Sequence, residues 1–345
     1  LNAFALPDGR PFLALTYLPK KDWLSLLARV QELYEEKPEY LVDQAEKLTQ
    51  GIQSSERITV AQSPAEFSKQ DFYGIFSSWQ ENIDLERGGR KGAPKFPMPI
   101  GQEFLLRHHY HTKSDVSLKA LTITLDNMAL GGIYDQLGGG FARYSTDEQW
   151  FAPHFEKMLY DNGQLVSLYA HAFQLTKNDL YKDIVYQTLA FIEREMTSPN
   201  GGFYSAFDAD SDGEEGTFYV WSYSECEQLL GSDFPLIRDY YGLTKSGNWE
   251  NGKNILAVEK SVDKLVDIHQ LSSHEIKSKL NNAKNVLFEA RKNRIPPALD
   301  DKILTAWNSL MISGYIDAYK AFSDTAFLEK AVKSSEFILR SLVNP

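Results

Sequence analysis

Residues 131–135, GGIYD, follow a predicted helix over 115–130, and the similar stretch GGFYS at 201–205 follows a predicted helix over 179–197. The two stretches lie 70 residues apart, a period that holds two helices and a loop and is typical of stacked helical hairpins. In each copy the glycine pair is expected to end the helix in the left-handed conformation, so that the aromatic segment projects from the helix end. The alternative is coincidence, because glycine often follows a helix.

The same helical pattern continues through most of the chain. Apolar residues at spacings of three and four predict further helices near 100–112, 154–175, 222–230, 272–293, 301–322 and 325–342. Ser63-Pro64-Ala65-Glu66 adds the start of another helix, with an N-cap serine and a proline at the first helical position. No long array of strands competes with these helices, so residues 56–345 are predicted to be mainly α.

Residues 1–55 differ from the rest and are typical of the end of an α/β unit. Short apolar strands at 3–6 and 11–18 flank Asp8-Gly9, a strong signal for a tight hairpin. Amphipathic helices are predicted over 21–36 and 38–53. A single hairpin with one or two helices cannot bury a core of its own. We therefore expect this segment to pack on another part of the protein, and we expect both natural ends of the protein to be missing.

The composition excludes several classes of protein. Of the 345 residues, 43% are apolar and 24% are charged, as in ordinary globular proteins. Lysine and arginine number 36 against 47 acidic residues, and a net charge of −11 argues against a nucleic-acid or anionic-membrane partner. No apolar run approaches the roughly 18 residues of a membrane span. The single Cys226 excludes an internal disulfide and a CxxC redox pair. A cytoplasmic location is expected, and the sequence does not set the oligomeric state.

Candidate chemistry is concentrated in residues 131–162, GGIYDQLGGGFARYSTDEQWFAPHFEKMLYDN. Pro153 is a natural helix start, so His154 is predicted in the first turn, where the helix dipole disfavours a protonated imidazole. A neutral imidazole beside a carboxylate is a candidate general base, and the alternative is a histidine that satisfies a loop carbonyl. The candidate catalytic residues of this segment are His154, Asp135, Glu156 and Asp161. Its candidate substrate-binding residues are Tyr134, Arg143, Tyr144, Trp150, Lys157 and Tyr160.

A second segment, residues 203–221, is predicted to form two short aromatic strands around an acidic turn. It matches the first half of an EF-hand loop, but Tyr219 stands where the bidentate glutamate belongs, so no calcium site is predicted. Asp208 and Asp210 are expected at the rim of a pocket, where they accept hydrogen bonds from hydroxyl groups. A solvated turn explains Glu215 and its neighbours equally well.

A third segment begins with Asp300-Asp301-Lys302 and opens a predicted helix. One aspartate suffices as the N-cap, which leaves Asp301 as a candidate catalytic residue. Lys302 and Trp307 are candidate substrate-binding residues, as is Lys95 in the rigid glycine- and proline-rich loop 88–97. No cofactor or metal is predicted, because the histidines at 108, 109 and 111 lack a nearby acidic ligand.

Several of these stretches together resemble the YyaL-like family of thioredoxin-domain proteins, of the spermatogenesis-associated-protein type. The resemblance rests on 131–162, APKFP at 93–97, DADSDGEEGTFYVW at 208–221, GKNIL at 252–256 and DDKILTAWN at 300–308. It implies a thioredoxin-like domain followed by an (α/α) toroid of the six-hairpin type, similar to N-acylglucosamine 2-epimerases and glycosidases. Residues 1–55 would then be the C-terminal remnant of the thioredoxin-like domain, and 56–345 a toroid cut short at its C-terminal end.

The sequence favours a carbohydrate-directed isomerase or epimerase. Aromatic rings would cover the apolar face of a sugar and carboxylates would bind its hydroxyls. His154 would abstract a proton beside a carbonyl, Asp135 or Asp301 would handle the proton on the oxygen, and Arg143 and Lys157 would stabilise negative charge. Two alternatives stay open: a glycoside hydrolase with paired carboxylates, and a non-catalytic module that binds a glycan, peptide or partner protein and is coupled to a thioredoxin-like domain. The sequence alone does not decide whether the protein is an enzyme.

Overall fold

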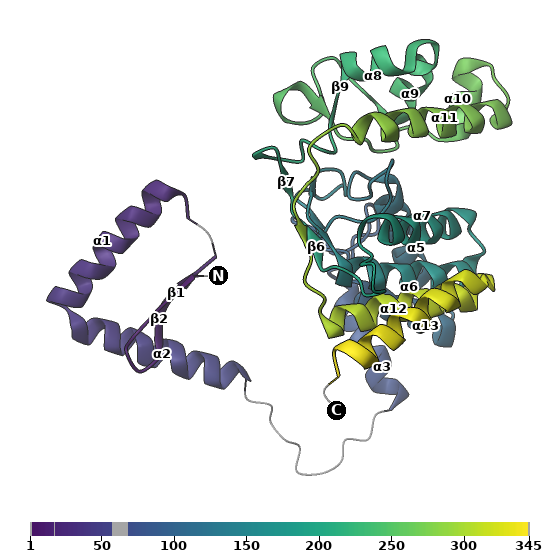
Figure 1. Cartoon of the computed structure of the whole chain (residues 1–345). Helices are drawn as coiled ribbons and strands as arrows, with labels where there is room; N and C mark the ends of the chain where they lie inside the picture. The colour runs from purple at the N-terminus through teal and green to yellow at the C-terminus, as the bar shows by residue number, and fades with distance from the viewer. Residues whose placement is uncertain (1, 17, 57–67, 344–345) are drawn as a thin grey trace. The chain divides into compact units, whose positions relative to one another are not determined.

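The computed structural model describes residues 2–16, 18–56 and 68–343 and divides the chain into two compact units, Leu1–Asp71 and Phe72–Pro345 (Figure 1). The helix start predicted at 63–66 lies outside the described residues. No described helix combines the length and apolar character needed to cross a lipid bilayer.

The first unit is a hairpin with two helices, as the sequence predicts. Strands β1 (Asn2–Ala5) and β2 (Pro11–Leu15) pair antiparallel, and helices α1 (Lys20–Glu36) and α2 (Pro38–Glu56) follow. Helix α1 has no buried residue. The assignment of this segment to a thioredoxin-like domain stays a prediction.

The second unit is built from helical hairpins, and helix α3 (Lys69–Gln80) spans the division between the units. The hairpins are α4 (Pro99–Thr112) with α5 (Asp115–Leu130), α6 (Leu159–Thr176) with α7 (Asp179–Glu195), and α12 (Thr305–Phe322) with α13 (Thr325–Ser341). Each turn between the two helices of a hairpin contains one residue in the left-handed conformation. The residue that follows caps the next helix with its side chain; these capping residues are Ser114, Asn178 and Asp324.

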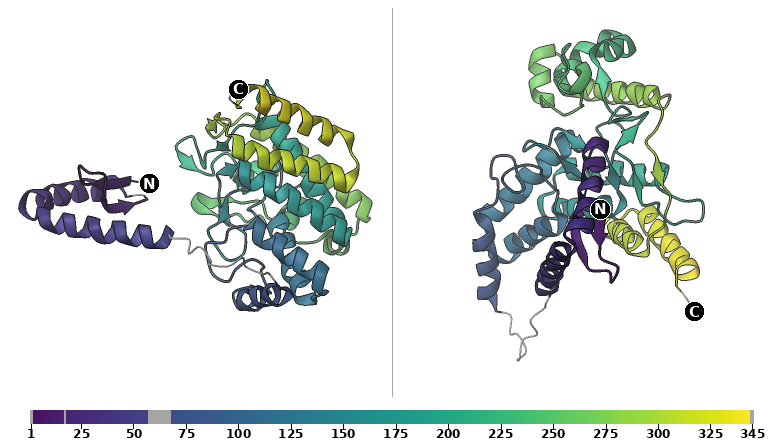
Figure 2. Two further views of the ribbon diagram at one scale, coloured as in Figure 1. Left: turned by 90° about the horizontal axis from the view of Figure 1, so that it is seen from below. Right: turned by 90° about the vertical axis from the view of Figure 1, so that its left-hand side faces the viewer.

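Helix α6 packs between α4 and α12, so these three helices lie side by side in one layer (Figure 2, left). The second helices α5 and α7 contact each other, and α13 packs on α12. The contact between α6 and α12 is close because a Cβ atom on Gly163 would lie 2.9 Å from the backbone of Met311. Helical hairpins that stack side by side in this way agree with the predicted (α/α) toroid of the six-hairpin type. The predicted mainly α fold is confirmed.

The internal repeat exists, but the predicted alignment of its two copies is wrong. Asn162 and Asn308 are each the fourth residue of their helices, α6 and α12. Asn162 accepts a hydrogen bond from the backbone N–H of Phe141 at 2.8 Å and donates to its carbonyl. Asn308 binds Phe203 in the same way, at 2.7 Å and 3.0 Å. The equivalent stretches are therefore 139–141 and 201–203, rather than 131–135 and 201–205.

The left-handed helix end predicted at the first glycine pair is also wrong. Gly131 follows α5 with a φ of −75°, in extended backbone. In the second copy, α7 ends at Glu195, several residues before Gly201, which does have a positive φ of 101°.

Residues between α7 and α12 form an insertion with a core of its own around Trp221, Ile237 and Leu287. Its helices are α8 (Tyr223–Leu230), α9 (Phe234–Tyr241), α10 (Val262–His269) and α11 (Ser273–Arg291). Strands β9 (Trp221–Ser222) and β10 (Lys253–Asn254) pair within it, and β7 (Asp210–Ser211) and β8 (Glu214–Glu215) form the acidic turn.

Two short sheets connect the loops to the helices and correct two predicted helix starts. Strand β3 (Tyr144–Ser145) pairs with β4 (Pro153–His154), so His154 lies in a strand and α6 begins only at Leu159. Strands β5 (Lys157–Met158), β6 (Ala206–Phe207) and β11 (Leu299–Asp300) form a three-stranded sheet. Asp300 is thus in a strand, and α12 begins at Thr305 with Leu304 as its N-cap, so neither Asp300 nor Asp301 caps that helix.

Candidate active site

Seven of the predicted site residues come together where the long loops meet the N-terminal ends of α6 and α12. We call them the Asp161 cluster; they are Arg143, Tyr144, His154, Glu156, Tyr160, Asp161 and Trp307. Contacts link its members from one end to the other: the rings of Tyr144 and His154 stack 5.0 Å apart, and those of Tyr160 and Trp307 meet edge to face at 4.8 Å. The antiparallel pairing of β3 with β4 sets the first contact, because it places Tyr144 directly opposite His154.

Asp161 lies in the first turn of α6 and is 8% exposed. Its Oδ2 atom is buried and has no hydrogen-bond partner among the described residues. Burial raises the pKa of Asp161 to about 7; Arg143 acts to lower this pKa, and the charge of Glu156 acts to raise it. A carboxyl group with this pKa can donate or accept a proton near neutral pH, as a general acid–base catalyst must.

Glu156 is the second carboxyl group of the cluster and has a different environment. The Nη1 atom of Arg143 donates to Oε2 of Glu156 at 3.1 Å, in a half-exposed ion pair. Asp161 has no such partner at Oδ2. Two carboxyl groups in contrasting surroundings are the arrangement that separates an acid from a base in many hydrolases and isomerases.

His154 is half-buried and is oriented by a residue from the insertion. Its Nδ1 atom lies 2.7 Å from Oε1 of Glu215, and its Nε2 atom lies 3.8 Å from Oε2 of Glu156. Because a carboxylate can only accept, the contact with Glu215 assigns the proton to Nδ1 in the neutral imidazole and leaves the lone pair on Nε2. The sequence alone explains Glu215 equally well as a residue of a solvated turn or as part of a pocket rim. Its partner His154 lies 61 residues earlier, and no local pattern signals the pair.

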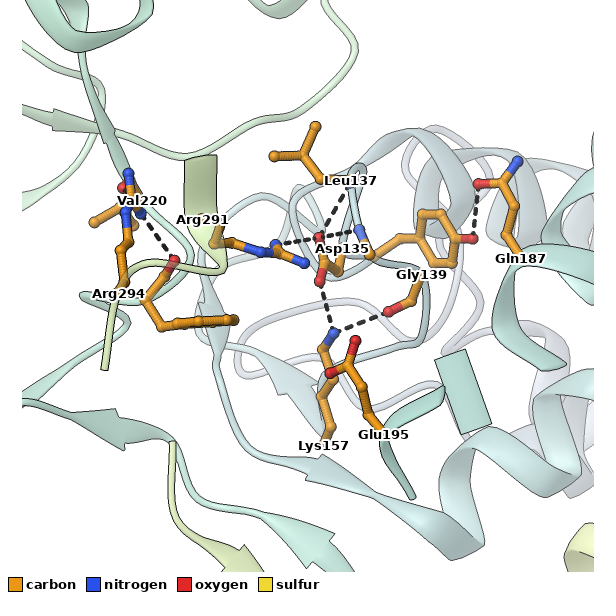
Figure 3. Close-up of polar contacts among 12 residues, drawn as sticks. Asp135, Leu137, Gly139, Lys157, Gln187, Glu195, Val220, Arg291 and Arg294 are labelled. Atoms are coloured by element: carbon orange, nitrogen blue, oxygen red, sulfur yellow. Dashed lines mark hydrogen bonds and ion pairs between the residues drawn. The ribbon is translucent and has the colours of Figure 1, made fainter. Parts of the chain in front are cut away.

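Asp135 and Lys157 lie in a separate buried cluster, and Arg291 of α11 is its third member (Figure 3). Oδ2 of Asp135 accepts from Lys157 at 2.8 Å; Oδ1 accepts from Arg291 at 2.8 Å and from the backbone N–H groups of Leu137 and Gly138. Burial acts to raise the pKa of Asp135, but the two cations outweigh it and hold this pKa far below its ordinary range.

The predicted proton-transfer role of Asp135 is therefore corrected to a structural one, because both oxygens are occupied by fixed donors. Lys157 likewise serves Asp135 and the carbonyl of Gly139 rather than a substrate. Glu156 and Lys157 are neighbours in the chain but have different partners. Glu156, directly before β5, pairs with Arg143, whereas Lys157, the first residue of β5, is buried beside Asp135.

Three further predicted binding residues have structural roles, which corrects their assignment. Tyr134 is buried and donates to Gln187 at 3.2 Å. The buried Nζ of Lys95 donates to Asp84 and to the carbonyl of Gly88, each at 2.7 Å. Trp150 is fully buried, and its indole N–H donates to the carbonyl of Arg87 at 2.9 Å.

The remaining predicted residues lie on the surface. Asp208 and Asp210 are exposed next to the acidic turn, and Asp208 accepts from the backbone N–H of Asp210. Asp301 is exposed in the segment before α12, and Lys302 pairs with Asp300 at 2.9 Å. The structure records no contact from these four residues to the Asp161 cluster. Within the described residues no group of three histidine, cysteine, aspartate or glutamate side chains could hold a metal ion.

Comparisons with known proteins identify homologues of about twice the length. No family model matches the chain. Spermatogenesis-associated protein 20 of Homo sapiens is 34% identical over 378 residues, which cover 99% of this chain and 48% of the human protein. The Mus musculus protein of the same name is 34% identical over 379 residues, with the same coverage. An uncharacterised Caenorhabditis elegans protein is 32% identical over 373 residues, 98% of this chain and 50% of that protein. The chain thus spans about half the length of the curated relatives it matches.

Solved structures with a similar trace have low sequence identity. A sugar epimerase from a ruminal bacterium matches with a TM-score of 0.37 and 14% identity over 78% of this chain and 86% of that one. The GH76A alpha-1,6-mannanase of Salegentibacter sp. matches with a TM-score of 0.42 and 12% identity over 80% of this chain and 53% of that one. A D-mannose isomerase matches with a TM-score of 0.35 and 12% identity over 81% of this chain and 88% of that one.

Proposed function

We propose that the Asp161 cluster binds a small sugar and isomerises or epimerises it by proton transfer. The observation that carries this proposal is Asp161 itself. Its carboxyl group is buried, has an oxygen without a partner in the described residues and has a pKa raised to about 7. Structural carboxylates are normally paired when buried, so a carboxyl group with an unpaired oxygen near Arg143 and Glu156 fits acid–base chemistry.

The roles follow from the partners of each side chain. His154 keeps the lone pair on Nε2 because Glu215 holds its Nδ1 proton, so Nε2 removes the proton from the carbon beside the sugar carbonyl. Asp161 in its protonated form delivers a proton to the carbonyl oxygen, which gives a neutral enediol. Arg143 stabilises the negative charge that develops on that oxygen before the proton arrives. In an epimerisation the same carbon takes a proton back on its other face, and the enediol hydroxyl returns its proton to Asp161 as the carbonyl re-forms. In an aldose–ketose isomerisation the former carbonyl carbon takes the proton, and the neighbouring hydroxyl loses its own as the new carbonyl forms.

The aromatic residues of the cluster fit a polyhydroxylated ring. Tyr160 and Trp307 form a half-buried pair beside Asp161, whereas the ring of Tyr144 stacks on both His154 and Phe96. Such faces cover the C–H side of a sugar, while carboxyl and guanidinium groups bind its hydroxyls.

A glycoside hydrolase is the second candidate, and the contrast between Asp161 and Glu156 favours it. Asp161 would be the general acid and Glu156 the base or nucleophile. A binding module without turnover is the third candidate.

Solvent exchange distinguishes these three functions. The protein is incubated in D₂O with a panel of aldoses and ketoses, and proton NMR follows deuterium entry at C2 together with new isomers. We expect exchange that Asp161→Asn and His154→Gln each reduce by about 100-fold or more, with Asp208→Asn as the exposed control that leaves it unchanged. Cleavage of aryl glycosides without C2 exchange would replace the proposal by a hydrolase. Saturable sugar binding with neither reaction would replace it by a binding module.

A further inference from the structure

A second pocket lies on the other face of the three-stranded sheet. Lys157, Phe207 and Leu299 are opposite one another in the register of β5, β6 and β11, so their side chains share one face. Phe207 and Leu299 line a pocket of about 480 Å³ on that face. Met158 points to the opposite face, and no residue of the Asp161 cluster lines the pocket. The pocket is therefore separate from the candidate active site.

The walls of this pocket are mainly carbon, and its volume is in the range of small-molecule sites. Its apolar lining includes Phe207, Phe218, Tyr219, Phe288, Pro297 and Leu299. The aromatic side chains come from the acidic segment, from β6 and from α11, so the folded insertion is needed to complete the pocket. Such walls fit a flat apolar ligand.

Arg291 at the base of the pocket supplies unused hydrogen-bond donors. Its side chain is 3% exposed, and the guanidinium lies 5.0 Å from the ring centre of Phe218 and 5.4 Å from those of Tyr219 and Phe288. A guanidinium carries five N–H donors. Among the described residues the structure records one acceptor for it, Asp135 at its Nη1 atom. A buried cation with free donors in an aromatic pocket fits an anionic group.

The charges around Arg291 also favour an anionic ligand. The single negative charge of Asp135 faces two cations, Arg291 and Lys157, while the neighbouring Arg194 and Glu195 pair with each other. One positive charge is therefore in excess. Burial lowers the pKa of Lys157; Asp135 and Glu195 act to raise it, and Arg291 acts to lower it further. An anion bound to Arg291 would supply the missing negative charge.

We propose that this pocket is a second ligand site that takes a small aromatic anion, with its ring system between Phe218 and Phe288 and its anionic group on Arg291. This inference is independent of the chemistry proposed for the Asp161 cluster, because neither site shares a residue with the other.

Two dyes with the same ring system test the proposal. 8-Anilinonaphthalene-1-sulfonate carries a sulfonate, and N-phenyl-1-naphthylamine is its uncharged counterpart. Titration calorimetry and fluorescence should show saturable one-to-one binding of the sulfonate, at least tenfold tighter than binding of the neutral dye. Leu299→Trp fills the pocket and should weaken the sulfonate at least tenfold. Leu328→Trp on α13, at a site of similar exposure (37% against 39%), should leave it unchanged.

Arg291→Met should remove the preference for the sulfonate over the neutral dye. Because loss of this buried partner could impair folding, the comparison of the two dyes on the unaltered protein tests the role of charge on its own. Equal affinity for both dyes, binding that Leu299→Trp does not change, or no saturable binding would each overturn the proposal.

Discussion

The side chain of Asn162 binds both backbone groups of Phe141: it accepts from the N–H of Phe141 at 2.8 Å and donates to the carbonyl of Phe141 at 3.1 Å. All of these groups are buried. The contact ties the loop that carries Arg143 and Tyr144 to the first turn of α6, one residue after Asp161. The loop and the acid are thus held in place by the same side chain.

Asn162→Ala should lower the free energy of unfolding by about 2–4 kcal/mol, because it leaves a buried N–H and a buried carbonyl without partners. Urea denaturation measures the change. Asn281→Ala, on the exposed face of α11, is the matched control and should change stability by less than about 0.5 kcal/mol. Equal effects of the two substitutions would contradict the structural role of Asn162.

Asp135→Asn should destabilise the protein by about 3–5 kcal/mol at pH 7, since it leaves Arg291 and Lys157 buried without their counter-charge. The pKa of Asp135 is depressed in the folded state, so its contribution is present above the unfolded pKa of about 3.9 and is lost as pH falls below it. Unfolding measured from pH 7 to pH 3 should therefore show a steeper acid loss in the unaltered protein than in the variant. Parallel curves would refute this assignment.

His171 on α6 should make stability depend on pH in the alkaline range. It lies 3.1 Å from Glu103 of α4 and 3.6 Å from Asp317 of α12, and hydrogen bonds to Asp317 and Glu103 raise its pKa to about 9. A raised pKa gives stability that is complete below the unfolded pKa of about 6.5 and is lost as pH rises through 9. His171→Gln should remove about 2 kcal/mol at pH 6 and little at pH 10, after allowance for solvent screening. The exposed His274→Gln is the matched control and should change stability by less than about 0.5 kcal/mol.

Asp161→Asn should stabilise the protein at alkaline pH while it abolishes activity. The raised pKa of Asp161 means that its ionised form is disfavoured by folding, so stability is lost as pH rises through about 7. The free energy of unfolding of the variant should exceed that of the unaltered protein by about 2–4 kcal/mol at pH 8.5 and should equal it near pH 4. A variant that is less stable at pH 8.5 would indicate a structural carboxylate instead.

The helical hairpins could be predicted because apolar periodicity and turn residues are local signals. The prediction for helix α5, over 115–130, matches the structure to the residue. Of the three eight-residue helices of the insertion, α8 is predicted near 222–230, whereas α9 and α10 are not predicted. His154 was misplaced because Pro153 is a good first helical residue, yet its strand partner Tyr144 lies ten residues earlier. The pairing of two strands that are each only two residues long gives almost no signal in the sequence.

The candidate site was predictable only in part, for a related reason. Proximity in the sequence groups Asp135, Glu156 and Lys157 together, but Glu156 pairs with Arg143, whereas Lys157 is buried with Asp135. The partners that decide the roles of Asp135 and His154 both come from the insertion. Arg291 lies 156 residues after Asp135, and Glu215 lies 61 residues after His154. No periodicity or motif reports contacts at that separation.

The most direct test of the account is the titration of the Asp161 carboxyl group itself. Carbon-13 NMR of the protein labelled at aspartate side chains, with Asp161→Asn to assign the resonance, follows this group from pH 4 to pH 9. We expect a midpoint near pH 7. A midpoint below about 5, in the range of ordinary aspartates, would contradict it.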